Sequence, residues 1–192
     1  MYDIADDAYC YSNSTVLKNI PGLRTQRALK RYEIAMTAQR AEEPLPPGRL
    51  GVSHYCAIHR HLFQDVYSWA GKFRRIRIAK SGSMFCYPEN IAREMSKLFS
   101  GLRTSNYLGG LSADKFAHSL AGFLTELNAI HPFRDGNGRA QLGFAALVAT
   151  RAGHPLDFAK LRPAPFLKAM IASFHGDEEI LESHIFRLMP KD

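Results

Sequence analysis

The sequence predicts an all-α protein, a compact helical bundle with one small β-hairpin, and three observations support this prediction. Most segments after residue 24 carry apolar residues at the spacing of an amphipathic helix. Only the stretch over residues 73–80 alternates apolar and polar side chains as a strand does. The length of 192 residues suits one domain with a single core. We therefore expect one domain over residues 1–192, with an N-terminal segment (1–24), a helical core (25–192) and a hairpin at about 73–88.

Helix formers, capping residues and apolar periodicity mark the helices of this core. They predict helices over residues 25–40, 50–66, 88–102, 112–127, 142–152, 163–174 and 178–188. Pro88 suits the first turn of the third helix, and Ser112 suits the cap of the fourth. Three prolines within residues 42–48 separate the first two helices. The fifth helix is apolar almost all round, which predicts that it is buried in the centre of the fold.

The expected hairpin follows the second helix. Residues 73–80 would form its first strand, Ser81-Gly82-Ser83 its turn, and residues 84–87 its second strand. A two-stranded hairpin is marginally stable alone, so it must pack on the helical body. Its free edge could pair with the extended backbone of a partner protein, and a plain connector is the alternative.

The charge of the chain is basic, with 25 Lys and Arg residues against 18 Asp and Glu residues, a net charge of +7 and a pI of about 9.5. This favours acidic partners such as nucleotide phosphates, nucleic acid or an acidic protein surface, and a well-solvated basic surface is the plain alternative. The basic runs match no nucleic-acid-binding motif, so we do not expect direct nucleic-acid binding.

Composition also indicates a cellular location. No apolar run approaches the roughly 20 residues of a membrane helix, and the acidic N-terminus lacks the pattern of a signal peptide. Cys10, Cys56 and Cys86 are widely spaced and odd in number, so neither a disulfide framework nor a zinc site is expected. We therefore expect a protein of the cytoplasm that does not associate with membranes.

The residues expected to take part in a reaction lie in the segment from Ile130 to Gln141, which joins two strongly apolar helices. Loops between rigid elements are common places for reactive groups. Gly136-Asn137-Gly138 leads into a helix, where backbone N–H groups lack internal partners and the helix dipole is positive. Such a start binds anions, and Arg139 in the first turn adds a planar cation that can hold phosphate oxygens.

Three more residues of this loop complete the set. His131 can take a proton from an attacking hydroxyl group. A carboxylate beside an anion site normally repels phosphates. Asp135 is therefore expected to bind a Mg²⁺ ion that lies between the carboxylate and the phosphates. Phe133 is expected to bury its ring and hold the loop. Nine residues thus offer a base, a metal carboxylate, an anion site and an arginine, the parts that phosphoryl-type transfer requires.

These residues resemble the signature of the Fic (filamentation induced by cAMP) family, His-X-Phe-X-(Asp/Glu)-Gly-Asn-Gly-Arg-X-X-Arg. The match extends without a gap from His131 to Arg139. Residues 11–19, 58–71 and 83–91 are similar to the family's N-terminal segment, to the helix before its hairpin, and to that hairpin, which is called the flap. The resemblance implies the family's helical bundle, with the flap beside the active-site loop.

The resemblance also implies an activity, the transfer of AMP from ATP to a hydroxyl side chain of a target protein. In this reaction His131 deprotonates the hydroxyl, and Asp135 holds Mg²⁺ on the α- and β-phosphates. The nucleotide site comprises Phe133, Gly136, Asn137, Gly138 and Arg139. The flap registers the target by main-chain pairing, and its candidate contacts are Lys80, Ser83, Met84 and Phe85.

The sequence departs from the family signature at one position, since Leu142 stands where the second arginine is expected. In the family that arginine steadies the terminal phosphate of ATP. Its loss would cost a few kcal/mol, on the order of a hundredfold in rate. Two interpretations compete: the activity is weakened, or the nucleotide is held differently with the help of another donor. A further alternative is that the chain is an engineered or naturally attenuated form.

Regulation and partners follow from the same resemblance. Many relatives carry an inhibitory helix, (Ser/Thr)-X-X-X-Glu-(Gly/Asn), which residues 1–192 do not contain. The chain therefore resembles bacterial toxins whose inhibitory glutamate comes from a separate small helical antitoxin. Toxins of this class modify type II topoisomerase subunits, whereas other relatives are secreted effectors that act on host proteins.

Two rival functions remain. The chain could transfer another phosphate-containing group, such as UMP, phosphocholine or phosphate, although the Gly136-Asn137-Gly138 sequence favours AMP. It could also be a catalytically silent module that binds the target or the antitoxin. Leu142 favours this second alternative, and His131 and Asp135 count against it.

Overall fold

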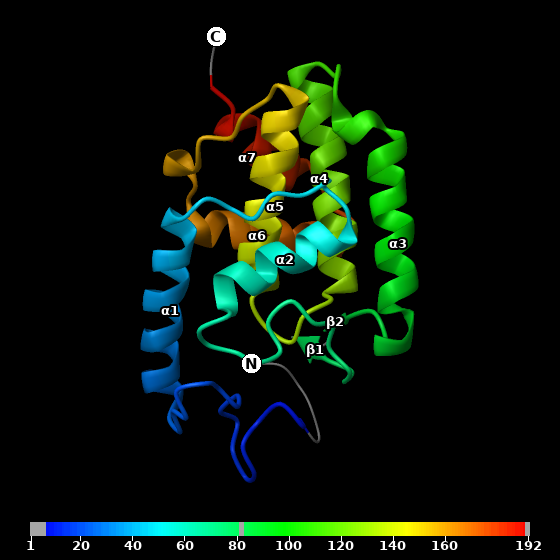
Figure 1. Cartoon of the computed structure of the whole chain (residues 1–192). Helices are drawn as coiled ribbons and strands as arrows, with labels where there is room; N and C mark the ends of the chain where they lie inside the picture. The colour runs from blue at the N-terminus through cyan, green and yellow to red at the C-terminus, as the bar shows by residue number, and fades with distance from the viewer. Residues whose placement is uncertain (1–6, 81–82, 191–192) are drawn as a thin grey trace. The chain divides into compact units, whose positions relative to one another are not determined.

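A computed structural model describes residues 7–80 and 83–190. Helices make up most of the described chain, and one antiparallel pair of short strands accompanies them (Figure 1). In chain order the elements are α1 (Gln26–Glu42), α2 (Val52–Phe63), β1 (Ala79–Lys80), β2 (Ser83–Met84), α3 (Pro88–Thr104), the 3-10 helix η1 (Asn106–Leu108), α4 (Ala113–Ile130), α5 (Asn137–Ala152), the 3-10 helix η2 (Phe158–Lys160), α6 (Pro163–Phe174) and α7 (Glu179–Leu188). The prediction of an all-α fold with one hairpin is confirmed.

Local sequence signals set most helix ends. The Thr25 side chain accepts a hydrogen bond from the Ala28 N–H at the start of α1. The second helix was expected to extend to residue 66, but α2 ends at Phe63. The Val66 N–H donates to the Phe63 carbonyl in a turn instead of continuing the helix. The helical turns of α5 begin at Asn137, directly in the glycine segment, where the Ala140 N–H bonds to the Gly136 carbonyl at 3.2 Å.

The hairpin is shorter than expected. Its strands pair Ala79 with Met84 and Lys80 with Ser83, so Ser83 lies in a strand and not in the turn. The rest of the expected turn, Ser81-Gly82, lies outside the described residues. Beyond the strands the Phe85 N–H still donates to the Ile78 carbonyl at 3.3 Å. Residues 73–77 do not continue this ladder, because the Arg74 N–H donates to the carbonyl of Pro132 and the Arg75 N–H donates to the Tyr9 hydroxyl.

The first of two compact units comprises residues 7–92 and 131–140. In this unit α1 packs against α2, and the short hairpin follows α2 in the chain (Figure 1). Its core contains fully buried aromatic side chains of α2 and of the segments that follow, among them Tyr55, Phe63, Tyr67 and Phe133. The whole segment from His131 to Arg139 belongs to this unit.

The second unit comprises residues 93–130 and 141–190. Here α4 packs against α6 and α7, and α6 packs against α7. Phe144 of α5 contacts Phe99 and Phe123 at ring-centroid distances of 5.1 and 5.8 Å. The expectation that α5 is buried all round was too strong, since Leu142 and Leu147 are partly exposed. None of the described helices is long and apolar enough to cross a membrane.

Candidate active site

His131 opens the active-site loop in a left-handed backbone conformation, with φ of 48°. A non-glycine residue adopts this conformation at a cost, so the surroundings must hold it there. The Arg74 Nε–H donates to the His131 carbonyl at 2.8 Å. His131 is 8% exposed, and its imidazole stacks on the ring of Phe85 with centroids 4.0 Å apart and planes inclined by 19°. Both the backbone and the ring of His131 are therefore fixed.

Arg74 connects this loop to both sides of the flap. Its buried guanidinium donates to the Ile76 carbonyl at 2.7 Å and to the Cys86 carbonyl at 2.5 Å, in addition to the His131 carbonyl. A guanidinium suits this position because its donors form a rigid fork that serves several acceptors at once. The position of the flap and the position of His131 thus depend on one side chain.

Phe133 and Asn137 close the loop. The Phe133 ring is fully buried and lies 5.3 Å from the Tyr55 ring and 3.8 Å from the His59 ring, between centroids. The Asn137 side chain accepts from the Phe133 N–H at 3.0 Å and donates to the Phe133 carbonyl at 2.8 Å. The amide group of Asn137 is thus bonded to the backbone of the loop.

The start of α5 is shaped by Gly136. Its φ is +81°, and a Cβ atom at this position would lie 2.4 Å from Cζ of Phe63. Gly138, by contrast, is exposed and has open space around it. The N–H groups of the first helical turn, beginning at Asn137, have no carbonyl partner within the helix. The sequence predicts an anion site at this helix start, and that site stays a prediction.

Along the chain, Asp135 lies between His131 and this predicted anion site. Its Oδ1 accepts from the Gly136 N–H at 2.6 Å, which leaves Oδ2 for a cation. Burial, and next the charge of Glu33, raises the pKa of the Asp135 carboxyl above its ordinary value. Residues 7–80 and 83–190 contain no group of three or more His, Cys, Asp or Glu side chains that could hold a metal. One carboxylate fits Mg²⁺, which takes its other ligands from phosphates and water.

His59 is a buried residue of the site to which its sequence context gave no function. The Gly71 N–H donates to Nδ1 at 2.9 Å, so the ring proton must lie on Nε2, which is 2.9 Å from the Asp135 carbonyl. Burial lowers the pKa of His59 to about 4. A neutral imidazole therefore links the segment before the flap to the active-site loop. The sequence feature that indicates burial of His59 is its position on the apolar face of α2, which it shares with Tyr55 and Leu62.

Arg139 reaches α1 instead of extending into solvent. One guanidinium nitrogen lies 2.5 Å from Glu33 Oε1, and another donates to the Thr37 hydroxyl at 3.1 Å. The guanidinium carbon lies 4.4 Å from the centre of the Phe63 ring. No sequence pattern connects Glu33 with Arg139, because 106 residues separate them.

The four flap residues that were expected to contact the target differ in their exposure. Lys80 and Met84 are exposed and Ser83 is partly exposed, so these three face solvent in the hairpin. Phe85 is buried on the His131 ring. Leu142 follows Arg139 by three residues in α5 and is partly exposed.

An ion pair between the active-site loop and the N-terminal segment was not predicted from the sequence. Arg134 is buried and pairs with Asp7 at 2.6 Å, which fastens the loop to the N-terminal segment. Sequence spacing gives no sign of this pair, since 127 residues separate its members.

The chain is similar over nearly its whole length to proteins named as adenylyltransferases. It is 46% identical to "Probable protein adenylyltransferase y4lH" of Sinorhizobium fredii, over 98% of both chains. It is 35% identical to "Probable protein adenylyltransferase Fic" of Salmonella typhimurium, over 92% of this chain and 89% of the relative.

Solved structures share the fold, among them two effector proteins of Bartonella. The BepC effector protein of Bartonella tribocorum, with bound AMPPNP, superposes with a TM-score of 0.85 at 26% identity, covering 96% of this chain and 97% of its own. The N-terminal Fic domain of a Bep effector protein of Bartonella quintana, with bound ADP, gives a TM-score of 0.85 at 30% identity, covering 96% and 95%. The profile of the Fic/DOC family matches residues 49–149, and the chain therefore belongs to the Fic/DOC family.

Proposed function

We propose that this chain is a protein adenylyltransferase, which moves AMP from ATP to a hydroxyl side chain of a target protein. The observation that carries the proposal is the active-site loop itself. Within nine residues it offers a fixed imidazole, a carboxylate, the N–H groups of a helix start and an arginine. The names of the relatives and the nucleotides bound to the similar structures support the same activity.

In the proposed reaction His131 accepts the proton of the target hydroxyl. The hydroxyl oxygen then forms a bond to the α-phosphorus, the bond between the α-phosphorus and its bridging oxygen breaks, and pyrophosphate leaves. Arg139 and the N–H groups at the start of α5 stabilise the charge on the phosphates. Asp135 would hold Mg²⁺, which neutralises phosphate charge when it is bound.

The flap supplies the target site in this proposal. Lys80, Ser83 and Met84 face solvent and offer a strand edge that can register an extended target segment. Phe85 has a different role, since its ring supports His131 from the flap side. A target held on the flap would thus be registered by the same element that orients the base.

Leu142 and the missing inhibitory pattern lead to two finer proposals. Leucine offers no charge to the terminal phosphate of ATP, so we propose an activity weaker than that of an arginine version. We also propose that the chain is the toxin of a pair and that it acts in the bacterial cytoplasm. A small helical antitoxin would supply the inhibitory glutamate, and type II topoisomerase subunits or host proteins are the candidate targets.

A labelling experiment tests the proposed function. Purified chain is incubated with Mg²⁺, α-³²P-labelled ATP and bacterial lysate, beside His131→Ala and Leu142→Arg variants. We expect a labelled protein band that is absent with His131→Ala and stronger with Leu142→Arg. An excess of unlabelled UTP should leave the band unchanged. A band that persists with His131→Ala would contradict the assigned base, and no band with any version would favour a silent binding module.

A further inference from the structure

We propose that Glu33 of α1 is a positioning residue that holds Arg139 in the orientation in which it binds the phosphates of the nucleotide. The inference rests on the proposed function, because it assigns the phosphates to Arg139. It adds a residue from outside the signature, on a helix that begins more than 100 residues before the loop.

Three side chains surround the Arg139 guanidinium, and we call Glu33, Thr37 and Phe63 the arginine clamp. Glu33 Oε1 pairs with one terminal nitrogen at 2.5 Å. The Thr37 hydroxyl accepts from the other terminal nitrogen at 3.1 Å. The guanidinium carbon lies over the Phe63 ring, 4.4 Å from its centre. Contacts to both terminal nitrogens and to the ring therefore hold the Arg139 guanidinium in place.

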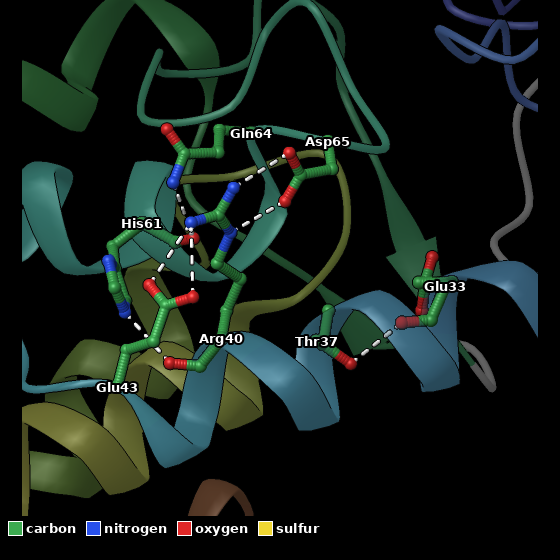
Figure 2. Close-up of polar contacts among 7 residues, drawn as sticks. All are labelled: Glu33, Thr37, Arg40, Glu43, His61, Gln64 and Asp65. Atoms are coloured by element: carbon green, nitrogen blue, oxygen red, sulfur yellow. Dashed lines mark hydrogen bonds and ion pairs between the residues drawn. The ribbon is translucent and has the colours of Figure 1, made fainter.

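The members of the clamp are themselves held. The Tyr67 hydroxyl donates to Glu33 Oε2, so the carboxylate bridges Tyr67 and Arg139. Figure 2 shows Glu33 and Thr37 one turn apart on α1, where the Thr37 hydroxyl donates to the Glu33 carbonyl at 2.8 Å. Because the hydroxyl proton is used there, its lone pairs are left for Arg139. The clamp thus has a fixed geometry before any nucleotide binds.

The clamp leaves the arginine able to bind an anion. A guanidinium has five N–H donors, and the two contacts of the clamp do not exhaust them. The Arg139 side chain is 38% exposed, whereas the Glu33 side chain is only 14% exposed. Glu33 therefore lies on the protein side of the guanidinium, and the open side remains for phosphate oxygens.

An opposite role for Glu33 makes a different prediction. A carboxylate near the phosphates repels them, and the charge of Glu33 reaches Asp135, whose pKa it raises. If Glu33 merely competed with phosphate for Arg139, its removal would strengthen ATP binding. If Glu33 positions Arg139, its removal frees a long side chain that must be ordered again on binding, and affinity falls.

The experiment measures the affinity of the full chain for ATP in the presence of Mg²⁺ by titration calorimetry. We expect Glu33→Gln to weaken ATP binding about tenfold, the effect of losing one charge-assisted contact. Asp65→Asn is the matched control. Asp65 makes a two-point ion pair with Arg40 of α1, at 2.7 and 2.9 Å, in a cluster with Glu43 that does not include Arg139 (Figure 2). This variant should bind ATP as the parent does.

A double-mutant cycle separates positioning from general damage to the fold. In an Arg139→Ala background, Glu33→Gln should change ATP affinity less than twofold, because its partner is gone. Thermal unfolding of each variant checks that the fold is intact. Adenosine, which lacks phosphates, should bind the parent and Glu33→Gln equally.

The outcomes distinguish the two proposals. If the parent binds no ATP, the proposed function fails, and the positioning role fails with it. If the parent binds ATP and Glu33→Gln binds it as tightly or more tightly, only the positioning role is overturned. An equal loss in the parent and in the Arg139→Ala background would also overturn it, because the effect would not pass through Arg139.

Discussion

At the scale of single residues, Gly136 gives the sharpest expectation for stability. A Cβ atom there would lie 2.4 Å from Cζ of Phe63, and the φ of +81° disfavours any other residue. We expect Gly136→Ala to lower the free energy of unfolding by about 2–4 kcal/mol, from overpacking and backbone strain together. Urea denaturation measures this change. Gly138→Ala is the control, since open space surrounds Gly138, and its effect should not exceed about 1 kcal/mol.

His59 gives an expectation for pH dependence. Its pKa is about 4 in the folded chain and 6.5 ordinarily, so the unfolded chain binds a proton more readily between these values. The stability that neutral His59 provides is complete above pH 6.5 and is lost as the pH falls to about 4. The loss is at most about 3 kcal/mol.

Unfolding free energies from pH 7.5 to 4 test this expectation, in the parent and in a His59→Gln variant, which keeps a donor for the Asp135 carbonyl. The difference in stability between the two should shrink as the pH falls from 6.5 to 4. A difference that stays constant over this range would show that His59 does not titrate as its burial implies.

At the scale of elements, Arg74 joins the flap to the active-site loop. We expect Arg74→Lys to loosen both, because one ammonium group cannot serve the carbonyls of His131, Ile76 and Cys86 together. Hydrogen exchange at the Phe85 N–H, which bonds to the Ile78 carbonyl, should become about tenfold faster or more. Target labelling should fall in parallel.

Arg77→Lys is the control for this variant. Arg77 is 62% exposed and pairs with Glu89 at 3.5 Å, so the exchange in the flap should hardly change. Equal acceleration in both variants would mean that the hairpin depends on its overall charge and not on the contacts of Arg74.

The sequence predicted those elements whose determinants are local. The bounds of α6 match the expectation, since Pro163 at its start and His175-Gly176 after its end are local signals. The loop from His131 to Arg139 was found because its chemistry lies within nine residues. The prediction of a first hairpin strand from residue 73 was wrong, because the N–H groups of residues 74 and 75 bond to Pro132 and Tyr9, which are distant in the chain. Glu33, Arg74 and Arg134 were missed for the same reason, since each acts on a residue far away in the chain.

At the scale of the whole molecule, one domain over residues 1–192 stays a prediction. The described chain groups into two units, and both α3 and α5 contribute residues to each of them. Neither unit can unfold alone without breaking two helices, so we expect one cooperative transition. Scanning calorimetry should then give equal calorimetric and van't Hoff enthalpies. A calorimetric enthalpy well above the van't Hoff value would indicate two units that unfold separately.

The neutral ring of His59 has a consequence for observing the protein at work. Its one ring proton is buried and bonded to the carbonyl of Asp135, so it should exchange slowly with water and give a separate downfield line in a proton NMR spectrum. The chemical shift of such a line follows the length of its hydrogen bond. One native nucleus would thus report, without any label, how the active-site loop responds when a nucleotide arrives.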